Sequence, residues 1–173
     1  MLPEETIALP EERVSFERER GVSAISVSPE VTYLFVRVPD TSDIPLKRQQ
    51  ILDSLHQANI SIFLIKLQRQ GLSFALHAAD TERTCAELEA RGYHLTVRPR
   101  RRMVSIFAQN MRELHGVLAR TAEMLYELGV AIEQISDAHN RLTLLIDADH
   151  APEVVNRLRK AFHLREDAVR WNP

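Results

Sequence analysis

Residues 62–76 read IFLIKLQRQGLSFAL and residues 132–146 read IEQISDAHNRLTLLI. A constant shift of 70 residues relates the two stretches, because apolar residues recur in register without a gap, as Leu72 does in Leu142. Each stretch holds two apolar runs around a short polar segment of turn-forming residues, which is the pattern of a β-hairpin. The repeat therefore indicates two copies of one supersecondary unit.

The same shift extends the repeat beyond the hairpins. Strands are predicted at 31–38 and 103–108, where β-branched and apolar residues suit a half-buried pleated surface. A helix is predicted after each, at about 46–58 and 116–128, because apolar residues at three- and four-residue spacing form one stripe. A second amphipathic helix follows each hairpin. The hairpin strands are predicted at 60–67 and 72–77 in the first copy and at 131–135 and 142–147 in the second.

The last strand differs between the copies. In the first copy, residues 93–98 complete a ferredoxin-like βαββαβ unit. In the second copy the residues after Phe162 are too polar for a strand, but residues 22–27 alternate polar and apolar upstream of both copies. We expect this upstream segment to supply the missing edge strand, so that the first copy is inserted between pieces of the second.

The predicted fold is therefore α+β, with two ferredoxin-like units whose antiparallel sheets carry helices on one face. The expected organisation is a lead-in at 1–20, a first unit at 31–100, a second unit made of 21–30 and 101–165, and a tail at 166–173.

Composition narrows the function classes. The 173 residues are 45% hydrophobic and 27% charged, as in ordinary globular chains. The net charge of −2 lacks the basic excess that nucleic-acid binding needs, and the basic run at 98–102 contains no aromatic residue, so we expect a solvated linker there and no nucleic-acid partner. The apolar stretch at 60–65 is too short for a membrane span, and the acidic N-terminus resembles no signal peptide. These features predict a cytoplasmic protein without a membrane partner.

Metal and cofactor chemistry have little support in the sequence. Cys85 is the one cysteine of the chain, so neither an internal disulfide nor a multi-cysteine metal cage is expected. Asp147, Asp149 and His150 cluster in sequence, but neighbouring residues at a strand end point to different sides, and acidic residues are common at the start of a helix. We therefore expect neither a bound metal nor a cofactor.

Several segments, taken in chain order, resemble the tandem ACT regulatory region of bacterial aspartokinases, particularly the diaminopimelate-sensitive type. They are 22–25 (VSAI), 104–107 (VSIF) with Met111-Arg112 and Gly116-Val117, 135–139 (ISDAH) and 160–164 (KAFHL). The resemblance covers about residues 20–164 and implies two ACT units that sense an amino acid, with diaminopimelate, lysine or threonine as the effector. It also implies a homodimer formed through the ACT units, and a kinase carried on a separate subunit. The family's KFGG kinase motif is missing from the sequence, so we expect no catalytic residue.

An amino-acid effector presents a carboxylate and an ammonium group, and a strand-to-helix loop offers backbone N–H groups to the carboxylate. In the second copy, Asn110, Met111 and Arg112 lead to Gly116, which allows close approach of a ligand to the backbone. The corresponding loop of the first copy contains Asp40, Ser42 and Asp43. The resemblance adds Ser136, Asp137 and His139, where a histidine could meet the second carboxylate of diaminopimelate.

Each candidate also has a plain structural interpretation. Asp40 and Asp43 are common turn and cap residues, and Pro45 suits the first turn of a helix. Arg112 could be a solvated loop charge, Gly116 could ease a tight junction, and the segment at 136–139 could be an ordinary turn. The chain also departs from the family pattern, since Ala131 replaces an effector-binding asparagine. A degenerate ACT protein that serves as a dimerising scaffold without an effector is therefore the alternative function.

Overall fold

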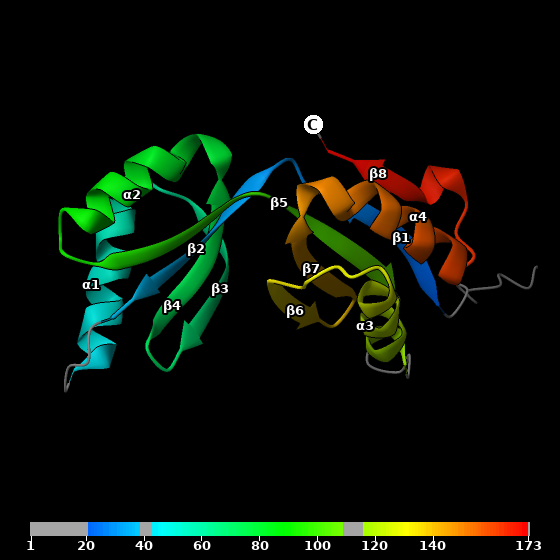
Figure 1. The fold of residues 1–173 in the computed structure, drawn as a ribbon, viewed down its shortest axis with the longest axis horizontal. Helices are drawn as coiled ribbons and strands as arrows, with labels where there is room; N and C mark the ends of the chain where they lie inside the picture. Colours follow the sequence, from blue (N-terminus) through cyan, green and yellow to red (C-terminus); the bar gives the residue numbers. More distant parts are fainter. Residues whose placement is uncertain (1–20, 39–42, 109–115, 173) are drawn as a thin grey trace, which may run out of the picture.

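The computed structural model describes residues 21–38, 43–108 and 116–172 (Figure 1). Its sheet is organised around β5 (His94–Ala108), a strand of 15 residues that runs from one half of the molecule into the other. Along one edge of β5 lie β2 (Val31–Arg37), opposite residues 94–101, and β1 (Val22–Val27), opposite residues 104–108. The predicted α+β class is confirmed: helices accompany a sheet whose paired strands are antiparallel except where β8 joins β1.

We call the half that begins at β2 the first unit. It contains α1 (Ile44–Gln57), β3 (Ile62–Gln68), β4 (Gly71–His77), α2 (Thr81–Glu89) and the first half of β5. Its strands lie in the order β3-β4-β2-β5. Leu34, Ile51, Phe74 and Leu88 have no exposed surface and pack the helices against the sheet. Full burial of a side chain of this size stabilises the fold by about 1.5–3 kcal/mol.

The second unit comprises the second half of β5, then α3 (Val117–Glu127), β6 (Gln134–Ala138), β7 (Arg141–Asp147) and α4 (Ala151–Ala161). Its strands lie in the order β6-β7-β5-β1, so the upstream strand β1 pairs with the edge of β5 opposite to β7. Short helical turns precede α2 and α4 at Ala78–Asp80 and Ala148–His150, again 70 residues apart.

The helix-free faces of the two units pack on each other. Val31, Tyr33, Ala75 and Leu145 form this third core, and they are at most 9% exposed. The two units are thus joined by a packed apolar contact as well as by the shared strand β5.

Strand β4 approaches β2 closely where it begins. Gly71 opens β4 opposite Arg37, and a Cβ atom at Gly71 would lie 2.0 Å from the carbonyl oxygen of Val36. Distances this short do not occur between real atoms, so this position requires glycine because the two strands approach closely there.

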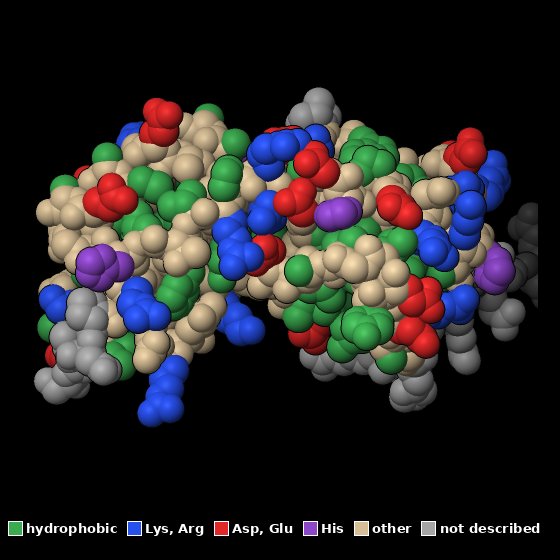
Figure 2. Space-filling model, viewed as in Figure 1, with side chains coloured by type: hydrophobic (Ala, Val, Ile, Leu, Met, Phe, Trp, Pro, Cys, Tyr) green, Lys and Arg blue, Asp and Glu red, His purple; other side chains and the backbone are tan. Residues whose placement is uncertain are grey.

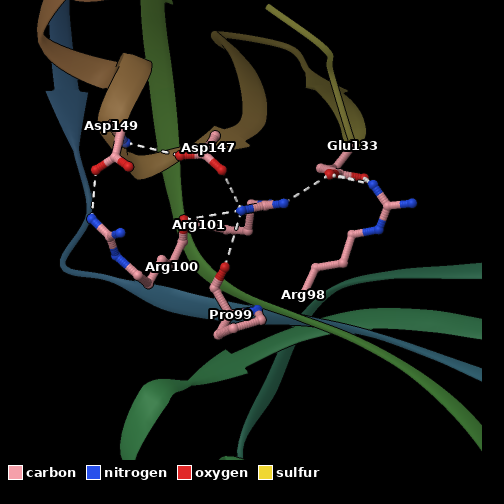
Figure 3. A network of polar contacts seen from close by, with 7 residues as sticks. All are labelled: Arg98, Pro99, Arg100, Arg101, Glu133, Asp147 and Asp149. Carbon is pink, nitrogen blue, oxygen red and sulfur yellow. Dashed lines mark hydrogen bonds and ion pairs between the residues drawn. The ribbon is translucent and has the colours of Figure 1, made fainter.

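The basic run at 98–102 is not the linker that the sequence predicts, because it forms the middle of β5. Acidic residues from distant segments neutralise it, as Figure 3 shows. The guanidinium of Arg101, only 14% exposed, donates to Asp147 at 2.6 Å and to Glu133 at 3.3 Å. Arg98 donates to both oxygens of Glu133, at 2.8 and 3.0 Å. In Figure 2, arginine and acidic side chains accordingly lie side by side where the two units meet.

Two further boundaries differ from the sequence prediction. The expected tail contains a short strand, β8 (Val169–Trp171), which pairs in parallel with β1, while Arg102 lies 5.7 Å from the ring centroid of Trp171. A short polar segment forms a strand here because β1 offers it an open edge. The hairpin strand expected at 131–135 begins only at Gln134, and the turn is correspondingly reduced to His139 and Asn140.

Candidate functional site

The strand-to-helix junction of the first unit is closed by its own sequence. Asp43 precedes α1, and its Oδ1 accepts a hydrogen bond from the backbone N–H of Leu46 at 3.1 Å, with Pro45 in the first turn. The capping interpretation of Asp43 is therefore confirmed. The neighbouring candidates Asp40 and Ser42 lie outside the described residues.

Replacing Asp43 with alanine should lower the free energy of unfolding by about 1 kcal/mol, the usual value of a helix N-cap. Asp43→Asn keeps a capping oxygen and is the matched control, so it should lose little. Urea denaturation of both variants measures the difference. Equal losses in the two variants would mean that the negative charge of Asp43 matters and its hydrogen bond does not.

The junction of the second unit is built differently. Gly116 precedes α3 with φ at +89°, a left-handed conformation that favours glycine, and a Cβ placed there would meet no atom within 4 Å. Among the described residues, no side chain caps the start of α3. The backbone N–H groups of the first turn of α3 therefore have no side-chain acceptor in the described structure. Asn110, Met111 and Arg112 lie outside the described residues.

The β6–β7 hairpin carries three further candidate residues, and its turn lies beside the last residue of β5. Ser136 and Asp137 lie on β6 and His139 lies in the turn, and all three are exposed. The carbonyl of Asn140 accepts from the backbone N–H of Ala108 at 3.1 Å, so the turn lies beside the last residue of β5. The first unit repeats this contact, since the carbonyl of Gln70 accepts from Val38 N–H at 2.8 Å.

The described candidates thus divide between the two ends of β5. Asp43 follows β2, whose last residue, Arg37, lies opposite the first residue of β5, whereas the β6–β7 turn lies at the last residue of β5. A strand rises roughly 3.3 Å per residue, so about 45 Å of β5 separates the two ends. The structure therefore offers two separate candidate sites related by the repeat.

Other features of the described residues offer little catalytic chemistry. Burial, and next the charge of Glu89, raise the pKa of the Cys85 thiol, so this thiol is a poor nucleophile. Burial also raises the pKa of Tyr93, against the opposing effect of Arg91. Within the described ranges, no group of three potential ligands is arranged to hold a metal ion, and none of their helices could cross a membrane.

Sequence reasoning missed two grooves at equivalent positions of the repeat, each beside the first helix of its unit. One groove of about 360 Å³ lies between α3 and α4 and is lined by Arg120, Glu123, Met124, Glu127, Arg157, Lys160 and Ala161. The other, of about 400 Å³, lies in the first unit and is lined by Lys47, Gln50, Asp53, Ser54, Gln57, Arg91 and Tyr93. The shift that relates Gln50 to Arg120 could have identified them as a pair. Gln134, a buried polar residue where the first copy has Leu64, was missed as well.

Comparison with known proteins agrees with this arrangement. The ACT domain family matches residues 104–162. Aspartokinase from Geobacillus stearothermophilus is 26% identical over 164 residues, which cover 91% of this chain and 40% of the relative. The chain thus spans about 40% of the length of that curated relative.

Solved structures show the same similarity. A chain from the crystal structure of aspartokinase alpha and beta subunits is 28% identical, with a TM-score of 0.74 over 83% of this chain and 99% of that one. The ligand-free regulatory subunit of aspartate kinase from Thermus thermophilus shares the fold, with a TM-score of 0.69 and 19% identity over the same shares. Residues 104–162 thus resemble the ACT domain family, and in sequence and fold the chain is similar to aspartokinase regulatory proteins.

Proposed function

We propose that the chain is a non-catalytic regulatory protein that senses an amino acid, in the manner of the feedback-inhibited region of an aspartokinase. The observation that carries this proposal is the repeated junction, in which a hairpin turn is hydrogen-bonded to the strand end that leads to a helix, at Val38 and at Ala108. The similarity of the chain to aspartokinase regulatory proteins supports the same role.

The second unit is the better effector site. The start of α1 already receives the carboxylate of Asp43, whereas α3 has no side-chain cap among the described residues. An effector carboxylate at the start of α3 would meet N–H groups that no described side chain caps, and the positive end of the helix dipole. Gly116, together with Asn110, Met111 and Arg112, forms this part of the proposed site.

The hairpin of the second unit supplies the remaining contacts in this proposal. Asp137 lies opposite Leu142 and attracts the effector's ammonium group. Ser136, its neighbour on β6, offers a hydroxyl from the opposite face of the strand. An imidazole N–H of His139, in the turn, donates to a second carboxylate. Because diaminopimelate has two carboxylates, we place it first among the effectors, followed by lysine and threonine.

The proposed assembly is a homodimer joined through sheet edges. β3 is an outer strand of the sheet, and it exposes 47% of Ile65 and 61% of Leu67. An exposed apolar edge strand is a ready template for pairing with another chain. The edge formed by β6 instead presents Ser136 and Asp137, which suits a ligand better than a second sheet. We further propose a cytoplasmic location and a kinase on a separate subunit as the regulated partner.

The alternative is a dimerising scaffold without an effector. Asp43 favours it, because its carboxylate occupies the place of a ligand carboxylate at the start of α1. Ala131, where the family has an effector-binding asparagine, favours it as well.

Thermal unfolding with diaminopimelate, lysine or threonine separates the two functions. At about 100 times its dissociation constant, an effector should add about 2.7 kcal/mol of stability, or roughly 5–10 °C in Tm for a chain of this size. His139→Ala should reduce the shift caused by diaminopimelate but spare the shift caused by threonine. Arg69→Ala, the equivalent turn position in the first unit, is the matched control and should change neither shift. If none of the three raises Tm at 10 mM while sedimentation shows a dimer, the scaffold function is supported instead.

A further inference from the structure

The side chain of Gln134 leaves its own unit. Gln134 is the first residue of β6 in the second unit, and it is only 6% exposed. Its Oε1 accepts from the hydroxyl of Ser73 on β4 at 3.3 Å, and its Nε2 donates to the carbonyl of Leu64 on β3. Both partners belong to the first unit, so the amide bridges the two hairpins.

An irregularity in β3 makes the second of these contacts possible. Leu64 has a positive φ of 51°, and the register of β3 on β4 shifts between Phe63 and Lys66. A bulge of this kind takes residues out of the ladder and leaves their backbone groups to other partners. Here the freed carbonyl of Leu64 receives the amide of Gln134, which stands 70 residues later at the equivalent position of the repeat.

The hydrogen bonds continue from Ser73 into the junction of the first unit. The hydroxyl of Ser73 accepts from Nε2 of Gln68 at 3.0 Å. The backbone carbonyls of Gln68 and Gly71 in turn accept from the guanidinium of Arg48 on α1. A chain of hydrogen bonds therefore runs from β6, through Gln134 and Ser73, to the β3–β4 turn and the first turns of α1.

The hydrogen bonds of Gln134 lie in an apolar interface, which increases their contribution to stability. The interface around them is the apolar third core, in which Ala75 and Leu145 have no exposed surface. Hydrogen bonds are electrostatically stronger in such a medium, and a buried polar group that loses its partner is costly. The adjacent Glu133 is held as well, by Arg98 and Arg101. The start of β6 is therefore fixed against the first unit, while its far end carries the exposed hairpin.

We propose that Gln134 is a positioning residue that couples the two hairpins, so that a change in the β6–β7 hairpin is transmitted to the β3–β4 hairpin and to α1. Its physiological meaning rests on the proposed function, because an effector bound beside His139 would then alter the distant junction at Asp43. Such coupling is reciprocal, so the junction of the first unit would influence the effector site equally.

The test uses hydrogen exchange of the ligand-free full chain, measured by mass spectrometry. Ser136→Pro removes a backbone N–H from the middle of β6 and perturbs its hairpin, and Ser136→Gly is the milder substitute if the proline variant fails to fold. When Gln134 is present, either substitution should accelerate amide hydrogen exchange in residues 62–71 about three- to tenfold. In a Gln134→Met background, which keeps the side-chain length but removes the amide, the same substitution should leave residues 62–71 unchanged.

Gln50→Met, an exposed glutamine-to-methionine change on α1, is the matched control and should preserve the transmitted effect. Equal acceleration in the Gln134→Met and wild-type backgrounds, or no acceleration in wild type, would overturn the coupling. Neither result depends on a ligand, so the coupling can fail while the thermal-shift test of amino-acid sensing succeeds, and the reverse holds as well.

Discussion

Replacing Gly71 with alanine is expected to lower the free energy of unfolding by about 3 kcal/mol or more. The added Cβ would lie 2.0 Å from the carbonyl oxygen of Val36, 3.0 Å from its carbonyl carbon and 3.3 Å from Cα of Arg37. All three atoms belong to the backbone of β2, which is paired on both edges, so the clash cannot be relieved by rotating a side chain. Overpacking without room to relax typically costs at least 1–3 kcal/mol.

Urea denaturation measures this loss, and Gly129→Ala is the matched control. Gly129 has φ of +66° but nothing within 4 Å of a built Cβ. Its replacement should therefore cost only the left-handed strain of a non-glycine residue, about 1 kcal/mol. Similar losses of unfolding free energy in the two variants would show that β4 and β2 have room for a Cβ atom at position 71.

The second large effect is expected at Arg101. Arg101→Met should cost about 3 kcal/mol, because Asp147 loses the cation that it shares with Glu133, and Glu133 keeps only the half-exposed Arg98. Glu133 is only 13% exposed, so water compensates for the lost cation poorly. Hydrogen bonds from the guanidinium to the carbonyls of Pro99 and Arg100, at 3.0 and 3.2 Å, are lost as well.

Arg100→Met is the control for Arg101→Met. Arg100 pairs with Asp149, but the two side chains are 59% and 65% exposed, and ion pairs in such positions contribute at most about 1 kcal/mol. The unfolding free energies of the two variants should therefore differ by about 2 kcal/mol or more. A smaller difference would mean that solvent reaches Glu133 once Arg101 is gone.

The elements that depend on local periodicity could be predicted well. The repeat placed the first helix of each copy at 46–58 and 116–128, within two residues of α1 and α3 at either end. Asp43 could be predicted as a cap because an acidic residue two positions before a proline is typical of a helix start. Apolar spacing and cap chemistry are local properties, so the sequence alone carries them.

The features that depend on distant partners could not be predicted. Five consecutive residues rich in arginine are typical of a solvated linker. Backbone pairing with β2 and β7 makes a strand of them, and Glu133, Asp147 and Asp149, more than 30 residues away, neutralise their charge. β8 is a strand because β1 offers it an edge, and nothing in its own three residues indicates this. The contact of Gln134 required the bulge at Leu64, which no periodicity predicts.

The place of β1 in the sheet has a consequence for the order of events during synthesis. β1 is translated well before its partner in β5: Ser23 and Phe107, joined by a hydrogen bond, are 84 residues apart. At about 5–20 residues per second, the ribosome needs roughly 4–17 s to bridge that gap. The first unit has time to fold meanwhile, whereas β1 remains an unpaired apolar segment. Its pairing is therefore a late, long-range step, and the interval before it is when the nascent chain is most exposed to aggregation.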